Sequence, residues 1–324
     1  IDSEQARQLA ALGYIGSAAP TAPGEELPDP KDRIHDVDAI KLGLIAFQEE
    51  RYEDAVATFG KLLRDNPRMI DVWSMQARAL AKLGRREQAI EAAKSGLRVA
   101  PAATNLAIMV GNLSFEENRL DEAEAHARLA LKDIPSQAHF LLAQIARRRK
   151  DYAAATREAN LAATEHRDRP LALMLLGEIA IDQNRLDDAL RNFEDALAVV
   201  ERSNHSPIPK LHYLRGDVLA RLGRAAEAER ELKIEIRHFP KEPQPYKNLI
   251  LLYALQGRTD EATELVFALE KASPLPMSYV AIAEALDAIG DEQGARYWTA
   301  RGLRRYPESR ELRQSVNERA RTTR

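Results

Sequence analysis

An alanine that recurs about every 34 residues is the feature that most constrains what this chain can fold into. Each time it closes a short polar stretch: "RYEDA", "RREQA", "RLDEA", "DYAAA", "RLDDA", "RAAEA", "RTDEA" and "DEQGA". The alanines are Ala55, Ala89, Ala123, Ala155, Ala189, Ala228, Ala262 and Ala295, separated by 34, 34, 32, 34, 39, 34 and 33 residues. This period predicts a row of similar supersecondary units.

Other positions keep step with these alanines and indicate a pair of helices in each unit. Four and seven residues after the alanine come pairs such as Phe59 and Leu62, at the spacing of one helical face. Twelve residues before it we expect a close backbone crossing, because the residue is mostly small, with Ile250 the exception. This position holds Gly43, Ala77, Gly111, Ala143, Gly177, Gly216, Ile250 and Ala283. Alanine and leucine dominate and no β-branched alternation competes, so each unit predicts two antiparallel helices joined by a tight polar turn.

Prolines predict where the second helix of each pair ends, since proline cannot continue a helix interior. They are Pro67, Pro101, Pro135, Pro240, Pro274 and Pro307. Arg167 and Glu201 stand at this place in the fourth and fifth units, which leaves those two ends less defined. The fifth unit also carries the insertion "SNHSPIP" at residues 203–209. A longer surface loop is expected there, and a binding edge is the alternative.

The eight units, at about residues 36–307, resemble the tetratricopeptide repeat (TPR) family. This resemblance implies an all-α, right-handed superhelical solenoid of about eight TPR helix pairs, whose first helices line a concave groove that holds other proteins or peptides. A solenoid needs a polar lid. In residues 308–324, Leu312 and Val316 form a narrow apolar stripe on an otherwise charged segment, which predicts a capping helix with a frayed tail. A basic tail for an acidic partner is the alternative.

Residues 1–35 predict a short helix and a linker rich in alanine, proline and glycine. Here "ARQLAALGYIG" followed by "LPDPKD" resembles the junction in bacterial sulfatase-like proteins of the alkaline phosphatase superfamily, where "LxALGY" ends the catalytic domain and TPR repeats follow. The resemblance implies a non-catalytic tail of a larger hydrolase, and it slightly favours a periplasmic or exported location. The sulfatase nucleophile motif, Cys or Ser followed by x-Pro-x-Arg, does not occur in this chain.

No catalytic, cofactor or metal motif is found in the sequence. The chain has no cysteine, its 7 histidines form no HExxH pair, and its 15 glycines form no phosphate-binding loop. The stretch "HDVD" at residues 35–38 suggests a metal corner, but acids at a helix start more often cap it. We therefore expect no enzyme activity, no cofactor and no metal site in this chain.

Charge and hydropathy restrict the partners. A formal net charge of -3 argues against nucleic acid, whose binding draws on a basic surface. No apolar run is long enough to cross a bilayer, so membrane insertion is not expected, while a homo-oligomer is possible. The basic cluster "RRRK" at residues 147–150 complements a helix C-terminus, or presents Arg147 and Arg148 to a ligand.

Projecting the first helices of repeats two to four predicts a ligand groove. Its residues are Met75, Arg78, Lys82, Met109, Asn112, Phe115, Phe140, Gln144, Arg147 and Arg148. Thioethers and aromatics beside cations and amides suit an extended acidic or carboxylate-ended protein segment. The equivalent later positions are acidic: Glu178, Asp182, Asp217, Glu284 and Asp287. The groove should thus change from basic to acidic, unless these are ordinary solvated residues.

Overall fold

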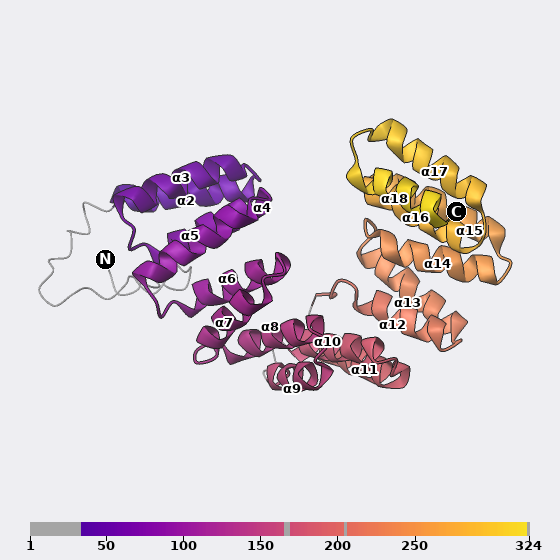
Figure 1. Cartoon of the computed structure of the whole chain (residues 1–324), viewed down its shortest axis with the longest axis horizontal. Helices are drawn as coiled ribbons and strands as arrows, with labels where there is room; N and C mark the ends of the chain where they lie inside the picture. Colours follow the sequence, from indigo (N-terminus) through magenta and orange to yellow (C-terminus); the bar gives the residue numbers. More distant parts are fainter. Residues whose placement is uncertain (1–33, 165–168, 204–205, 323–324) are drawn as a thin grey trace, which may run out of the picture. The chain divides into compact units, whose positions relative to one another are not determined.

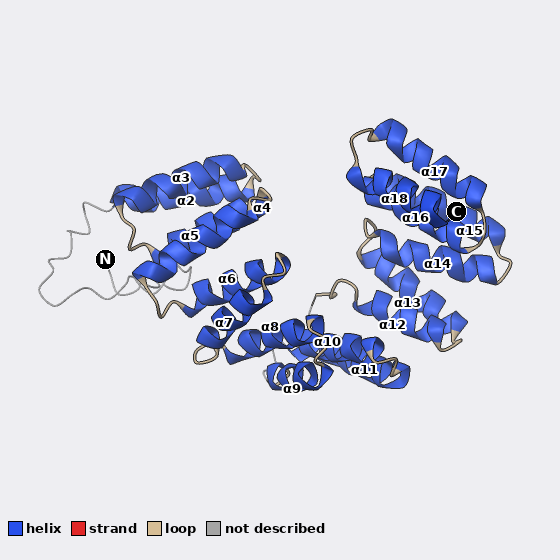
Figure 2. Ribbon diagram, in the orientation of Figure 1, coloured by secondary structure: helices blue, strands red, loops and turns tan. Residues whose placement is uncertain are grey.

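The computed structural model describes residues 34–164, 169–203 and 206–322, and in these ranges its regular structure is helical throughout (Figure 2). The helix and linker predicted for residues 1–33, with the sulfatase-like junction, lie outside the described residues. Two compact units divide the chain between Asp168 and Arg169. Unit 1 holds α2–α9 and unit 2 holds α10–α18 (Figure 1).

The helices follow one another as eight pairs and one further helix, which confirms the predicted all-α repeat fold. In unit 1 the pairs are α2 (Ile34–Gln48) with α3 (Tyr52–Asp65), α4 (Ile70–Lys82) with α5 (Arg86–Val99), α6 (Thr104–Glu116) with α7 (Leu120–Ala130), and α8 (Pro135–Arg148) with α9 (Tyr152–Ala162). In unit 2 they are α10 (Arg169–Asp182) with α11 (Leu186–Arg202), α12 (Leu211–Arg221) with α13 (Ala225–His238), α14 (Pro243–Leu255) with α15 (Thr259–Ala272), and α16 (Pro276–Ala288) with α17 (Glu292–Arg305), followed by α18 (Arg310–Thr322). The predicted domain boundaries at residues 35 and 307 stay predictions.

The turn inside each pair has one residue in the left-handed conformation, always five positions before the repeating alanine. These residues are Glu50, Gly84, Asn118, Lys150, Asn184, Gly223, Gly257 and Gly290, with φ between 57° and 85°. In the α4–α5 turn, the Gly84 amide donates to the Ala81 carbonyl and the Arg85 amide to the Leu80 carbonyl, both at 3.0 Å. This hydrogen bonding satisfies the last carbonyls of the first helix and reverses the chain.

We predict that Lys150→Gly stabilises unit 1. Lys150 is exposed and has a φ of 63°, where its Cβ is crowded by the backbone and glycine is not. The free energy of unfolding, measured with urea, should rise by about 0.5–1 kcal/mol. Asn184→Gly is the control and should gain less, because asparagine tolerates this conformation. An unchanged or lower value for Lys150→Gly would contradict the argument.

The small position of the first helix is set mainly by a side chain of the second helix. The Phe193 ring presses on Gly177 and the Phe59 ring presses on Gly43, so a Cβ at either glycine would overlap an aromatic carbon. The backbone crossing expected from the sequence is therefore wrong at these two positions. It holds at Gly111, where a Cβ would lie 3.3 Å from a backbone carbonyl oxygen. Small first-helix residues thus make room for large second-helix ones.

We predict that Gly177→Ala lowers the free energy of unfolding by about 1–2 kcal/mol, because the strain against the fully buried Phe193 ring exceeds the gain in helix propensity. Gly60→Ala is the control. Its Cβ would meet only the ends of the Gln76 and Arg64 side chains, at 3.2 and 3.7 Å, and should gain up to about 1 kcal/mol. Thermal unfolding of both variants measures the difference, and a stabilised Gly177→Ala would refute the steric account.

Each first helix completes the core of the pair before it. In unit 1, Val72 and Ala79 of α4 lie in one buried cluster with Ala55, Phe59 and other residues of α2 and α3. The clusters around α5 and α7 are extended in the same way by α6 and α8. In unit 2 a single buried cluster runs from Leu173 to Leu312. The pairs are therefore stabilised by their neighbours, as expected for a stacked array.

Helix lengths explain the two breaks in the period. Second helices usually end two residues before their proline, as α3 does at Asp65 before Pro67, which confirms the predicted stops. α7 is only 11 residues long, while α11 has 17 and runs through Glu201, where no proline stands. The remaining insertion precedes α12, whose first turn is held by the buried carboxylate of Glu235 through the amides of Lys210 (2.6 Å) and Tyr213 (3.2 Å). Arg167 lies outside the described residues.

α18 packs on α16 and α17 at the end of unit 2, as a capping helix should. Leu312 is fully buried, as expected, but Val316 is exposed and Ser315 is buried in its place. The predicted stripe is therefore wrong at Val316. Burial of Ser315 is tolerated because the Arg319 guanidinium donates a hydrogen bond to its hydroxyl (2.6 Å).

Candidate functional site

The ten predicted groove residues all lie on α4, α6 and α8, the first helices of three successive repeats in unit 1. α4 contacts α6, and α6 contacts α8. None of the ten is buried. Exposed are Arg78, Lys82, Asn112 and Arg148; half-buried are Met75, Met109, Phe115, Phe140, Gln144 and Arg147. We call these ten residues the first-helix face.

Two members of this face meet across neighbouring repeats. The guanidinium carbon of Arg148 on α8 lies 4.7 Å from the centre of the Phe115 ring on α6. Its Nη1 also donates to Oδ1 of Asn118, the left-handed residue after α6, at 3.3 Å. A guanidinium is attracted to the face of an aromatic ring and is weakly hydrated, so this arrangement restrains Arg148 without neutralising it.

Arg78 is held in the same manner. Its guanidinium carbon lies 5.5 Å from the centre of the Phe47 ring on α2. Sequence reasoning missed Phe47, although it stands four residues after Gly43, just as Phe115 stands four after Gly111. That equivalence was the available signal. In the described part of the chain, no carboxylate pairs with Arg78 or Arg148, and none pairs with Lys82.

Arginines near the turns contrast with these, because they form ion pairs from one repeat to the next. The pairs are Arg85 with Glu53, Arg119 with Glu87, Arg149 with Asp121 and Glu124, and Arg258 with Glu229. Their carboxylates are satisfied by the fold itself. The turn edge therefore links the repeats and offers little charge to a ligand.

The cluster "RRRK" is divided among these roles. Arg148 stacks on Phe115, Arg149 pairs with two carboxylates, and Lys150 is the left-handed turn residue. Arg147 also interacts within the chain. Only Arg148 combines exposure with a defined position and an uncompensated charge, so it is the member of the cluster best placed to meet a ligand.

Glu229 on α13 is the most strongly perturbed carboxylate of the turn edge. Its side chain receives hydrogen bonds from Nη1 of Arg258 (2.6 Å), Nζ of Lys233 (2.7 Å) and the Tyr253 hydroxyl (2.9 Å). The bond from Arg258, reinforced by the other two, lowers the pKa of Glu229 to about 2. This carboxylate therefore joins the sixth repeat to the seventh.

We predict that Glu229→Gln costs about 1–2 kcal/mol of stability at pH 7, and that this cost disappears in acid. A carboxylate whose pKa is lowered on folding stabilises the protein above its unfolded pKa of about 4.5, and the stabilisation is lost as the pH falls towards 2. Urea unfolding between pH 7 and pH 3 measures it. Glu264→Gln, an exposed position on α15, should have little effect at any pH. A cost independent of pH would exclude this ion pairing as its cause.

The five acidic positions predicted for the later repeats all interact within the chain. Asp217 accepts from Nδ2 of Asn248 (2.9 Å), Glu284 from Nζ of Lys247 (2.8 Å), and Asp287 pairs with Arg319 (2.7 Å). Glu178 and Asp182 have interactions of their own. Burial raises the pKa of Asp287. In unit 2 these carboxylates therefore serve contacts between neighbouring helices.

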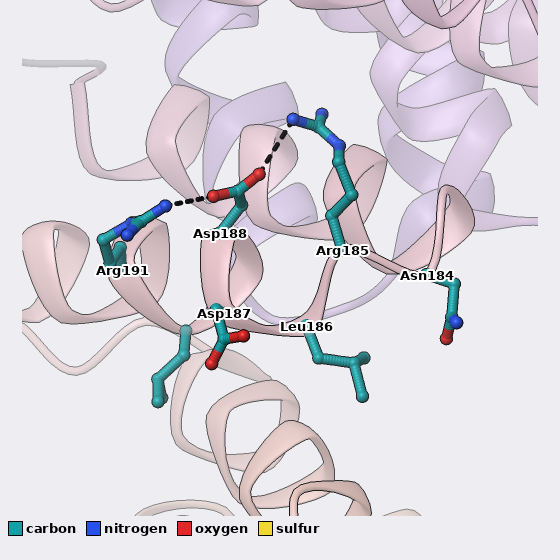
Figure 3. A pocket seen from close by; sticks show the side chains of 7 residues that line it. Asn184, Arg185, Leu186, Asp187, Asp188 and Arg191 are labelled. Atoms are coloured by element: carbon teal, nitrogen blue, oxygen red, sulfur yellow. Dashed lines mark hydrogen bonds and ion pairs between the residues drawn. The ribbon is translucent and has the colours of Figure 1, made fainter.

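An open hollow lies at the α10–α11 turn of unit 2 (Figure 3). Asp188 pairs there with both Arg185 and Arg191, while Asp187 points away from that pair. The two aspartates act as turn residues, as the sequence predicts. With Asp188 already paired twice, the hollow has no set of converging polar groups of the kind that orients a small ligand.

Metal and membrane features are not found in the described ranges. There, no group of three or more His, Asp or Glu side chains is placed to hold a metal ion, and no helix is both long and apolar enough to cross a bilayer. His139 and His212 each pair with one glutamate of the following helix, at 2.7 Å. The side chain of His35, from the stretch "HDVD", lies outside the described residues.

Comparison with known families places the repeats. Two family models, each described as a tetratricopeptide repeat, match the chain: one at residues 46–113, the other at residues 174–243 and 213–275. Together these ranges span more than half of the chain and include repeats of both units. A search of curated proteins finds no match.

Solved structures share the fold at low sequence identity. PilW, a type IV pilus biogenesis factor, is 20% identical with a TM-score of 0.56, covering 67% of this chain and 99% of its own. A tetratricopeptide repeat protein from Parabacteroides merdae is 17% identical with a TM-score of 0.53, covering 76% and 97%. The Cut9–Hcn1 complex of the APC/C is 15% identical with a TM-score of 0.54, covering 88% of this chain and 60% of the matched chain. At such identities the likeness shows the fold alone.

Proposed function

This chain belongs to the tetratricopeptide repeat family, and we propose that it is a non-catalytic scaffold whose first-helix face binds an extended, carboxylate-bearing segment of a protein partner. One observation carries this proposal: Arg78 and Arg148 are each positioned over a phenylalanine ring of the preceding first helix, without a carboxylate partner in the described part of the chain. Most turn-edge arginines, by contrast, are paired.

Recognition would combine charge with apolar area. An arginine whose flat face rests on a ring keeps its N–H edge available, and that edge can donate two parallel hydrogen bonds to a carboxylate. Met75, Met109 and Phe140 are half-buried nearby on the same three helices and supply adaptable apolar contact. Arg78 on α4 and Arg148 on α8 lie two repeats apart, so a partner segment must be extended to reach both.

A second proposal concerns the larger protein. The junction-like segment at residues 12–32 supports a role as the accessory or oligomerisation region of a sulfatase-like hydrolase whose catalytic domain precedes Ile1, with a periplasmic or exported location. Residues upstream of Ile1 in the gene product test it. A Cys or Ser followed by x-Pro-x-Arg is expected there, and an unrelated domain would refute the idea.

For the scaffold, we predict that the double variant Arg78→Glu/Arg148→Glu abolishes acidic-peptide binding. Dodecapeptides selected from a random phage-displayed library on the full chain should be enriched in Asp and Glu. Fluorescence polarisation with a selected peptide should show affinity reduced about tenfold or more, because two attractions become repulsions.

The control variant is Arg64→Glu/Arg98→Glu. It makes the same charge change at exposed positions of the second helices α3 and α5, and should retain affinity within about twofold. Both variants should keep the wild-type circular dichroism. Peptides without acidic enrichment, or equal losses in the two variants, would contradict binding at the first-helix face.

A further inference from the structure

α2, the first described helix of the array, exposes apolar side chains on one side. Leu42 is 63% exposed and Ile45 is 45% exposed, and Val37 is exposed one and a half turns earlier. Lys41 and Asp38, which lie 4.0 Å apart, flank these residues with charge. We call Leu42 and Ile45 the α2 end face.

The same positions are covered in the later repeats of unit 1. The counterparts of Ile45 are at most 8% exposed: Ala79, Leu113 and Ile145. Each lies in a cluster with residues of the preceding helix pair. Val110 and Leu142, the counterparts of Leu42 on α6 and α8, are buried too. The α2 end face therefore has the side-chain type of a repeat interface and is left without its covering layer.

At the other end of the array this situation is resolved by the chain itself. α18 covers α16 and α17 and buries Leu312 completely. Two exposed branched side chains are an unfavourable end for a stacked array, because each would gain about 1.5–3 kcal/mol on full burial.

The chain has a suitable occupant in the residues that precede α2. Leu9, Leu12 and Ile15 recur every three residues in "QLAALGYI", the spacing of one helical face. The linker at residues 16–33 can reach up to about 60 Å at 3.3 Å per residue, whereas α2 is about 22 Å long. A tether of this kind keeps the segment at an effective concentration on the order of millimolar, which a second copy of the chain would not match in dilute solution.

We propose that residues 4–15 of the same chain cover the α2 end face and close the N-terminal end of the array. Leu9 and Leu12 take the place that a preceding second helix would fill against Leu42 and Ile45. Lys41 and Asp38 form the charged rim of this contact.

Crosslinking tests the contact directly, since the natural chain has no cysteine and introduced thiols are unique. The full-length variant Leu12→Cys/Leu42→Cys is oxidised at low concentration and analysed by peptide mass. A rapid disulfide within one chain is expected. Leu12→Cys/Leu129→Cys is the control, because Leu129 on α7 is equally exposed, at 58%, but lies away from the α2 end face. It should crosslink at least tenfold more slowly.

Equal rates in the two cysteine pairs would overturn the proposal, since they indicate random encounters of a tethered segment. A disulfide found only between chains would also overturn it, and would assign the face to a second copy. A double-mutant cycle of full-length proteins gives an independent readout. Leu12→Glu should lower the Tm of the wild type and leave the Tm of Leu42→Glu unchanged, whereas additive losses would contradict a direct contact.

Discussion

Burial of each first helix against the preceding pair is the interaction on which this structure depends. A single pair of helices of 11 to 17 residues has too little apolar surface to offset the entropy of ordering it. Ala79 of α4, Leu113 of α6 and Ile145 of α8 supply the missing layer, each entering the cluster of the pair before it. The identity of a repeat thus resides partly in its neighbour, and the two ends of an array become special sites.

The stacking also fixes the side of the molecule that is available for binding. Left-handed residues such as Gly84 and Asn118 reverse the chain after every first helix, and complementary sizes such as Gly43 against Phe59 set how closely the two helices approach. Because the geometry repeats, side chains at equivalent positions point the same way. Arg148 can therefore rest on the Phe115 ring of the preceding repeat, and Arg78 on Phe47. The proposed binding face is a consequence of the same periodicity that builds the core.

The alanine period was sufficient to predict the eight helix pairs, the proline stops and the placement of the ten candidate residues on first helices. These features follow from local periodicity, which one sequence displays. Contacts between repeats were not predictable in this way. Phe47 beneath Arg78, Asn248 beside Asp217 and the exchange of Val316 for Ser315 depend on helix rotation and on partners about 30 residues away. The Gly177 position was identified as crowded, but only the fold shows that a ring fills the space.

Site-specific photo-crosslinking of a bound acidic dodecapeptide tests the central claim most directly. A photoreactive phenylalanine analogue would replace Phe115 or Phe140 on the first-helix face, and in separate proteins Leu129 on α7 or Phe267 on α15, both exposed on second helices. The account predicts covalent capture of the peptide at Phe115 and Phe140 and little at the other two positions. Capture mainly at Leu129 or Phe267 would place the ligand on the second helices and contradict the account.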